Sequence, residues 1–275
     1  MKQNIKRLDI MVAYSCNVSC KGCISLSNFP RNGIEKFDDL EKSITYWSRH
    51  IVPHVVSIFG GEPLLHPKLL KILKLVRENW PHSTIRLITN GYLFDRYEPM
   101  SWYSFDKLEI QVSMHRSDHK KIITDKVLKI LKQKKGWKTY KIKDTRQHKF
   151  IEFVNDNLTI YMSQFKDFVM PYKLIDGKPV PYNSNPVVAH SLCGSPDTPI
   201  LYRGSLYKCA AIANLLEVAD KKVYSYNKVS SVEDLHLITD FINIPESICS
   251  ICPDNLDNLV DHFDKETVHV KQVIN

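Results

Sequence analysis

Short apolar runs alternate with longer amphipathic stretches along roughly the first two-thirds of the chain, and this pattern predicts strands separated by helices. Because strands joined by helices usually pair in parallel through right-handed crossovers, the pattern indicates an α/β fold with a parallel sheet. Further strands are expected within Tyr140–Ser163, without a defined register. The four clearest strands are predicted at Ile10–Tyr14, Val55–Phe59, Thr84–Thr89 and Leu108–Met114.

The amphipathic stretches between these runs have apolar residues at helical spacing. In Asp38–His50 apolar residues recur every three or four positions, and Asp38 is in the position of an N-cap. A second helix is predicted to start at Pro67, a residue type that suits the first helical turn, and a third lies within Asp118–Lys135.

The last third of the chain has a different composition. The stretch Leu174–Val188 is rich in Pro, Gly and Asn, which is typical of a connection between two structural units. We therefore expect one α/β domain over residues 1–180 and a second, cysteine-bearing domain over residues 181–275. In the second domain a hairpin is predicted with its turn at Arg203–Gly204.

Composition narrows the class of protein. The chain has 275 residues, of which 43% are hydrophobic and 25% are charged, as is ordinary for a globular protein. No apolar run is long enough for a membrane helix, and the N-terminal segment lacks the cleavage site of a signal peptide. We expect a cytoplasmic protein with no membrane partner.

Chemically active residue types follow the predicted strands at the point where each strand ends. A cysteine-rich loop follows the first strand, and Gly60-Gly61-Glu62-Pro63 follows the second. Asn90 follows the third strand, whereas Ser113 and His115 lie at the end of the fourth. Ligands of α/β folds gather at the carboxyl ends of the strands, so this coincidence predicts one functional site there.

The seven cysteines divide into a group of three and a group of four. Three thiolates can hold a four-iron cluster and leave one iron open for a ligand, whereas four thiolates can saturate a cluster or a metal ion. Structural zinc remains an alternative for both groups. The first group is Cys16, Cys20 and Cys23, and the second is Cys193, Cys209, Cys249 and Cys252.

The spacing C-x3-C-x2-C after the first strand, together with GGEP after the second, resembles the radical S-adenosylmethionine superfamily. The resemblance implies a partial (β/α)6 barrel, in which the first three cysteines ligate a [4Fe-4S] cluster. The four later cysteines resemble the twitch module, a shortened relative of the SPASM extension, which implies an auxiliary [4Fe-4S] cluster. One position departs from the family pattern, because Gly22 stands where many members have an aromatic residue.

The resemblance also implies roles for the residues at the strand ends. S-adenosylmethionine would occupy the open iron, and its reductive cleavage would give a 5′-deoxyadenosyl radical that abstracts hydrogen from the substrate. Glu62 would accept hydrogen bonds from the methionine ammonium, and Gly60 and Gly61 would allow close approach of the backbone. Asn90 and Ser113 are expected contacts to the ribose or the methionine carboxylate.

The expected substrate is a small polar or phosphorylated molecule such as a sugar, cyclitol or nucleotide. An auxiliary cluster with four protein ligands favours oxidation of the substrate radical. Candidates for proton handling are His115, Arg146 and Glu152. A reductant protein such as flavodoxin or ferredoxin is an expected partner. The alternatives are a nucleic-acid-modifying enzyme, a peptide-modifying enzyme, and a non-catalytic zinc or iron–sulfur module.

Positive charge is concentrated in one segment. The net formal charge of the chain is +8, and the segment Asp118–Lys149 has eleven Lys and one Arg against three Asp. Aromatic residues are interleaved with these cations, including Trp137 and Tyr140. The segment is interpreted either as a patch for a phosphate-bearing partner, including nucleic acid, or as a solvated helix and loop.

Overall fold

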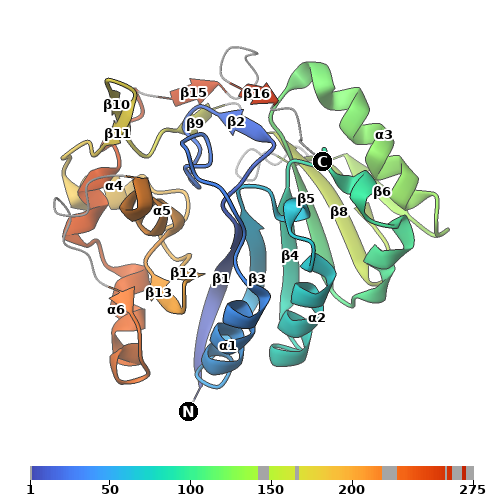
Figure 1. The fold of residues 1–275 in the computed structure, drawn as a ribbon, viewed down its shortest axis with the longest axis horizontal. Helices are drawn as coiled ribbons and strands as arrows, with labels where there is room; N and C mark the ends of the chain where they lie inside the picture. The colour runs from blue at the N-terminus through green and yellow to red at the C-terminus, as the bar shows by residue number, and fades with distance from the viewer. Residues whose placement is uncertain are drawn as a thin grey trace.

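A ten-stranded sheet with a parallel centre organises the protein (Figure 1). In the computed structural model the described residues are 2–141, 149–164, 167–218, 228–257, 259–261 and 268–270. The strand order is β14-β13-β12-β1-β3-β4-β5-β8-β7-β6, and neighbours from β12 through β8 pair in parallel. These parallel strands are β1 (Gln3–Ala13), β3 (Ile51–Gly60), β4 (Thr84–Thr89), β5 (Leu108–Met114), β8 (Leu158–Gln164) and β12 (Ile200–Tyr202).

The strands predicted at Thr84–Thr89 and Leu108–Met114 are confirmed, and the first two are longer than predicted. Both edges of the sheet are antiparallel. One edge is formed by β7 (Lys149–Val154) and β6 (Lys138–Lys141), and the other by β13 (Ser205–Tyr207) and β14 (Lys228–Val229).

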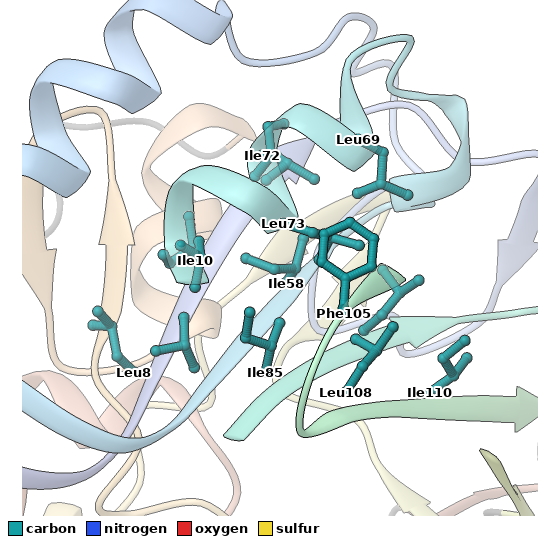
Figure 2. Packing of buried hydrophobic residues seen from close by; sticks show 14 of the residues in the cluster. Leu8, Ile10, Ile58, Leu69, Ile72, Leu73, Ile85, Phe105, Leu108 and Ile110 are labelled. Atoms are coloured by element: carbon teal, nitrogen blue, oxygen red, sulfur yellow. The ribbon is translucent and has the colours of Figure 1, made fainter. Parts of the chain in front are cut away.

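Three helices cover one face of the sheet, as Figure 1 shows for α1 (Phe37–Trp47), α2 (Leu69–Asn79) and α3 (Lys120–Leu131). Their apolar stripes pack against alternate strand residues in one continuous core, part of which Figure 2 displays. The prediction of Asp38 as N-cap was wrong. The N-cap is Lys36, and Asp38 lies in the first helical turn, where its carboxylate still complements the helix dipole.

In the described part of the C-terminal third, β12, β13 and β14 extend the main sheet. The hairpin of β12 and β13 turns at Arg203–Gly204, as predicted, and β12 pairs with β1. The indole N–H of Trp47 on α1 also donates to the Gly204 carbonyl at 2.9 Å. The predicted connection Leu174–Val188 contains secondary structure, namely part of the hairpin β10 (Lys173–Ile175) and β11 (Lys178–Val180) and the start of α4 (Pro186–Ser191).

Two small strand pairs and several short helices complete the described chain. The loop strand β2 (Val18–Cys20) pairs with β16 (Val268–Val270), and β9 (Asp167–Val169) pairs with β15 (Leu259–Asp261). No described helix has the length and apolar character needed to cross a membrane. The remaining α-helices are α5 (Ala210–Val218) and α6 (Ile238–Asn243), and the 3-10 helices are Pro63–Leu65, Phe94–Arg96, Pro99–Ser104, Ser117–His119, Glu233–Leu237 and Ser247–Ile251.

Candidate functional site

The first cysteine group lies on the loop that follows β1. Cys20 is buried, and Cys16 and Cys23 are half-buried, so all three thiols are partly shielded from solvent. The Val18 N–H donates to Cys16 Sγ at 3.4 Å, and Asn90 Nδ2 donates to the same sulfur at 3.7 Å. N–H donors directed at a sulfur favour its thiolate, which is the form that ligates iron.

Gly22 adopts a left-handed backbone conformation between Cys20 and Cys23, with φ of 76°. A side chain at this position would be strained, and its Cβ would lie 3.4 Å from Met170 Cγ. The backbone turn therefore explains why a glycine occupies the position before the third cysteine.

The two glycines that precede Glu62 allow close contact between the end of β3 and the residues at and after the end of β1. The Gly61 N–H donates to the Ala13 carbonyl at 2.8 Å, and the Glu62 N–H donates to the Ser15 carbonyl at 2.9 Å. A Cβ on Gly60 would lie 2.3 Å from Ala13 O, and one on Gly61 would lie 2.3 Å from Ser15 O. The close approach predicted for these glycines is thus made by the backbone of the cysteine loop itself.

Glu62 is completely buried where β3 and β4 end. Its Oε1 accepts hydrogen bonds from the Thr89 hydroxyl at 2.6 Å and the Leu64 N–H at 2.9 Å, and its Oε2 accepts from the Asn90 N–H at 2.8 Å. This geometry gives Glu62 a positioning role between the two loops.

Burial raises the pKa of Glu62 to about 7, although hydrogen bonds from Thr89, Asn90 and Leu64 oppose the shift. The folded protein then binds this proton more tightly than the unfolded chain does. The contribution of Glu62 to stability is therefore fully present below the unfolded pKa near 4.5 and is lost as pH rises to about 7.

We expect the free energy of unfolding of Glu62→Gln, measured by urea denaturation between pH 4.5 and 7.5, to lack this decline. The difference from wild type should change by on the order of 3 kcal/mol over that range. Equal slopes for the two proteins would show that Glu62 is ionised throughout.

Asn90 connects the glutamate loop to the cysteine loop. Its Nδ2 donates to Asn17 Oδ1 at 2.8 Å as well as approaching Cys16, and its backbone N–H is bound by Glu62. The structure therefore brings Cys16, Glu62 and Asn90 into one hydrogen-bonded unit at the carboxyl ends of β1, β3 and β4.

The other predicted residues of the first domain lie farther along the sheet. Ser113 is buried near the carboxyl end of β5, and His115 directly follows that strand. Glu152 lies on β7, opposite Tyr161 of β8. Arg146 lies outside the described residues.

The second cysteine group comes from three separate elements of the C-terminal third. Cys193 is exposed after α4, Cys209 follows β13, and Cys249 and Cys252 lie in and after the 3-10 helix Ser247–Ile251. Burial, together with the charges of Cys193 and Cys249, raises the pKa of Cys209 to about 12. The pKa of Cys252 is likewise raised, first by burial and then by the other three thiols.

The pKa of Cys252 thus responds to the three other thiols, which places these sulfurs within electrostatic range of Cys252. Four such thiolates would repel one another unless cations lay between them, so the donor set fits a metal cluster. Among the described residues, no three His, Cys, Asp or Glu side chains converge closely enough to bind a single metal ion.

Buried tyrosines join the two cysteine-bearing loops, which sequence reasoning missed. Tyr14 precedes Cys16 and makes an edge contact with Tyr202, with ring centroids 5.9 Å apart, and Tyr202 contacts Tyr207 at 6.0 Å. Arg31 of the cysteine loop donates to Asn214 Oδ1 of α5 at 2.6 Å. The tyrosine spacing before Cys16 and Cys209 is a signal in the sequence, but the pairing depends on the parallel contact of β1 with β12.

Residues 10–154 match the radical SAM superfamily. The GTP 3′,8-cyclase of Limosilactobacillus fermentum is 28% identical over 119 residues, which are 42% of this chain and 36% of the cyclase. The chain thus aligns with only about a third of the length of that curated relative.

Solved structures provide a further likeness at the level of the fold. BtrN in complex with AdoMet and 2-DOIA is 15% identical, with a TM-score of 0.51 and coverage of 95% of both chains. Native anSMEcpe with bound AdoMet and Cp18Cys peptide is 18% identical, with a TM-score of 0.35, over 48% of this chain and 40% of that one. With the family match extending over more than half of its length, the chain belongs to the radical SAM superfamily and is an enzyme of that superfamily.

Proposed function

We propose that the protein cleaves S-adenosylmethionine reductively and uses the resulting radical to abstract hydrogen from a small polar or phosphorylated substrate. The observation that supports this most directly is the hydrogen-bonded unit of Cys16, Asn90 and Glu62 at the carboxyl ends of β1, β3 and β4. The family implies a [4Fe-4S] cluster and S-adenosylmethionine as cofactors.

Three thiols of the cysteine loop would hold the cluster and leave its fourth iron to the cofactor. When bound, the cluster and S-adenosylmethionine supply the electron and the 5′-deoxyadenosyl radical. Cys16, Cys20 and Cys23 act as ligands, and Glu62 with Gly60 and Gly61 holds the loops in register for the methionine end. Asn90 and Ser113 are proposed contacts to the rest of the cofactor.

The fold proposal has two parts. Residues 1–180 are proposed to form a radical SAM partial (β/α)6 barrel, which the parallel strands and the helices on one face support. Residues 181–275 are proposed to form a twitch-like auxiliary domain. The neighbouring thiols raise the pKa values of Cys209 and Cys252, which supports an auxiliary [4Fe-4S] cluster. Its proposed ligands are Cys193, Cys209, Cys249 and Cys252.

A fully ligated auxiliary cluster would take an electron from the substrate radical, so the net reaction would be an oxidation. Proton handling is proposed for His115, Arg146 and Glu152. A flavodoxin or ferredoxin is proposed as the electron donor. A nucleic-acid substrate is the second candidate, because the β6 residues Lys138, Tyr140 and Lys141 are exposed.

The decisive experiment follows deuterium from substrate to cofactor. We expect anaerobically reconstituted, reduced enzyme to form 5′-deoxyadenosine, and one deuterated compound from a panel of sugars, cyclitols, nucleotides and peptides to transfer its label. Label appearing only from a peptide or an oligonucleotide would replace the proposed substrate class. Reduced, iron-loaded enzyme that forms no 5′-deoxyadenosine would refute the proposed chemistry.

A further inference from the structure

A buried cation lies beside the second cysteine group. Lys208 follows β13 and directly precedes Cys209, and only 3% of the residue is exposed. Its Nζ donates to the Ile244 carbonyl at 2.8 Å, shortly before the 3-10 helix Ser247–Ile251. Because burying an ammonium group costs desolvation free energy, lysines are seldom buried to this extent. Packing alone therefore does not explain a lysine at this position.

A second polar group of the same region is buried without a partner. His190 lies on α4, and its carbonyl accepts a hydrogen bond from the Cys193 N–H at 3.1 Å. The ring atom Nε2 of His190 is buried and has no hydrogen-bond partner within the described part of the chain. Buried polar atoms are nearly always hydrogen-bonded, and an orphaned one commonly fits a bound ion, water or cofactor. The orphaned nitrogen of His190 thus fits a bound group next to Cys193.

The segment before α4 is attached to the helix Ser247–Ile251. The Tyr182 N–H donates to the Ile251 carbonyl at 3.1 Å. The Ser184 hydroxyl donates to the Cys252 carbonyl at 2.6 Å. These contacts hold together the two segments of chain that carry three of the four cysteines of the second group.

Lys208 lies within electrostatic reach of both of these segments. Burial raises the pKa of the Cys249 thiol, and the charge of Lys208 opposes this shift more strongly than the charge of Glu246 adds to it. Burial lowers the pKa of His190, and the charge of Lys208 lowers it as well. The surroundings of Cys249 are therefore more positive with Lys208 present, and His190 belongs to the same neighbourhood.

Nearby charge and hydrogen bonds to the sulfurs both set the reduction potential of an iron–sulfur cluster. A cluster that takes up one electron gains one negative charge. A buried cation and an N–H donor stabilise that added charge, and both act more strongly in a protein interior than in water. A site with these two features favours a cluster that is easily reduced, as an electron acceptor must be.

We propose that Lys208 and His190 are positioning residues that raise the reduction potential of the second cluster, Lys208 through its charge and His190 through a hydrogen bond from Nε2. Neither residue is an iron ligand in this proposal. The substrate radical loses one electron to the oxidised cluster and one proton to a base or water, so the substrate is oxidised and the cluster is reduced. This inference rests on the proposed function and deepens it at the second site.

A redox titration of the full-length holoenzyme, followed by electron paramagnetic resonance, tests the role of Lys208. Lys208→Gln removes the charge and keeps an N–H donor for the Ile244 carbonyl, whereas Lys208→Arg keeps the charge. Lys208→Gln should disfavour reduction of the second cluster about tenfold, which lowers its midpoint potential by about 59 mV. Lys208→Arg should remain near the wild-type potential. The first cluster, whose signal changes when S-adenosylmethionine is added, should keep its potential in every variant.

Two further variants complete the set. His190→Phe removes the ring donor and should disfavour reduction of the second cluster by about threefold, as expected for one hydrogen bond. Lys228→Gln is the control, because Lys228 is an exposed lysine on β14 of the same part of the chain. It should leave both midpoint potentials unchanged.

A wild-type potential of the second cluster in Lys208→Gln would overturn the inference. Equal shifts in Lys208→Gln and Lys208→Arg would assign Lys208 a structural role and overturn it as well. Should Lys208→Gln fail to assemble the second cluster, His190→Phe decides the matter, and a wild-type potential in that variant refutes the inference.

Iron content separates failure of this inference from failure of the proposed function. Wild-type protein with about eight iron atoms, two cluster signals and no shift in any variant would refute the inference and leave the proposed function standing. Wild-type protein with about four iron atoms and a single signal would instead refute the auxiliary cluster itself.

Discussion

Replacing Cys20 by alanine is expected to reduce the iron and sulfide content from about eight of each per chain to about four, and to abolish S-adenosylmethionine cleavage. Three thiols hold the proposed first cluster, and the loss of Cys20 leaves only Cys16 and Cys23 of the three. Removal of a residue that hydrogen-bonds a metal ligand typically lowers activity by about 10- to 100-fold. Removal of the ligand Cys20 itself should lower cleavage by more than that.

The matched variant is Cys249→Ala in the second group. It should also lose about four iron atoms, but it should retain cleavage of S-adenosylmethionine in the absence of substrate, because the first cluster is intact. Iron and sulfide are measured chemically, and cleavage is measured as 5′-deoxyadenosine by chromatography. Zinc without sulfide in the wild-type protein, or equal loss of cleavage in both variants, would contradict the division into a reactive and a closed site.

Gly61→Ala is expected to unfold the cysteine loop locally although the substitution lies outside it. The added Cβ would lie 2.3 Å from Ser15 O and 2.7 Å from Ser27 Oγ, and Ser15 O is the acceptor for the Glu62 N–H. Backbone atoms on both sides must then move apart, at a cost of about 1–3 kcal/mol, as for other overpacked sites. Because Cys16 follows Ser15 directly, iron loading at the first site should fall.

Gly194→Ala is the control, because no heavy atom lies within 4 Å of its added Cβ. Its thermal midpoint and iron content should equal those of wild type, whereas Gly61→Ala should lose stability and about half of its iron. Measurements by calorimetry and iron analysis distinguish the two. A Gly61→Ala protein with full iron content and unchanged midpoint would show that the backbone contact between the two loops does not hold the site.

These two predictions share one physical cause. The cysteine loop after β1 contains few residues of regular structure, so its conformation depends on contacts with neighbouring segments. The contacts come from Gly61 and Glu62 after β3, from Asn90 after β4, and from Arg31 toward α5. A change at any of these contacts should therefore alter cofactor loading more than the stability of the sheet.

The central fold could be predicted from local pattern. Strands at Thr84–Thr89 and Leu108–Met114, the three helices, and the hairpin turn at Arg203–Gly204 all follow from periodicity and turn residues. The cap at Asp38 was misassigned because Lys36 and Asp38 both lie near the helix start, and no side-chain hydrogen bond decides the boundary there.

Sequence by itself also determined that three closely spaced cysteines follow the first strand and that GGEP follows the second, because these motifs are properties of neighbouring residues. Only the tertiary structure decided that β12 joins β1, that Glu62 is buried among three donors, and that Asp9, Ser57, Arg86 and Glu109 form one row. Periodicity tells which face of a strand a side chain occupies. Strand order and register depend on contacts between distant segments, and those contacts determine which side chains meet.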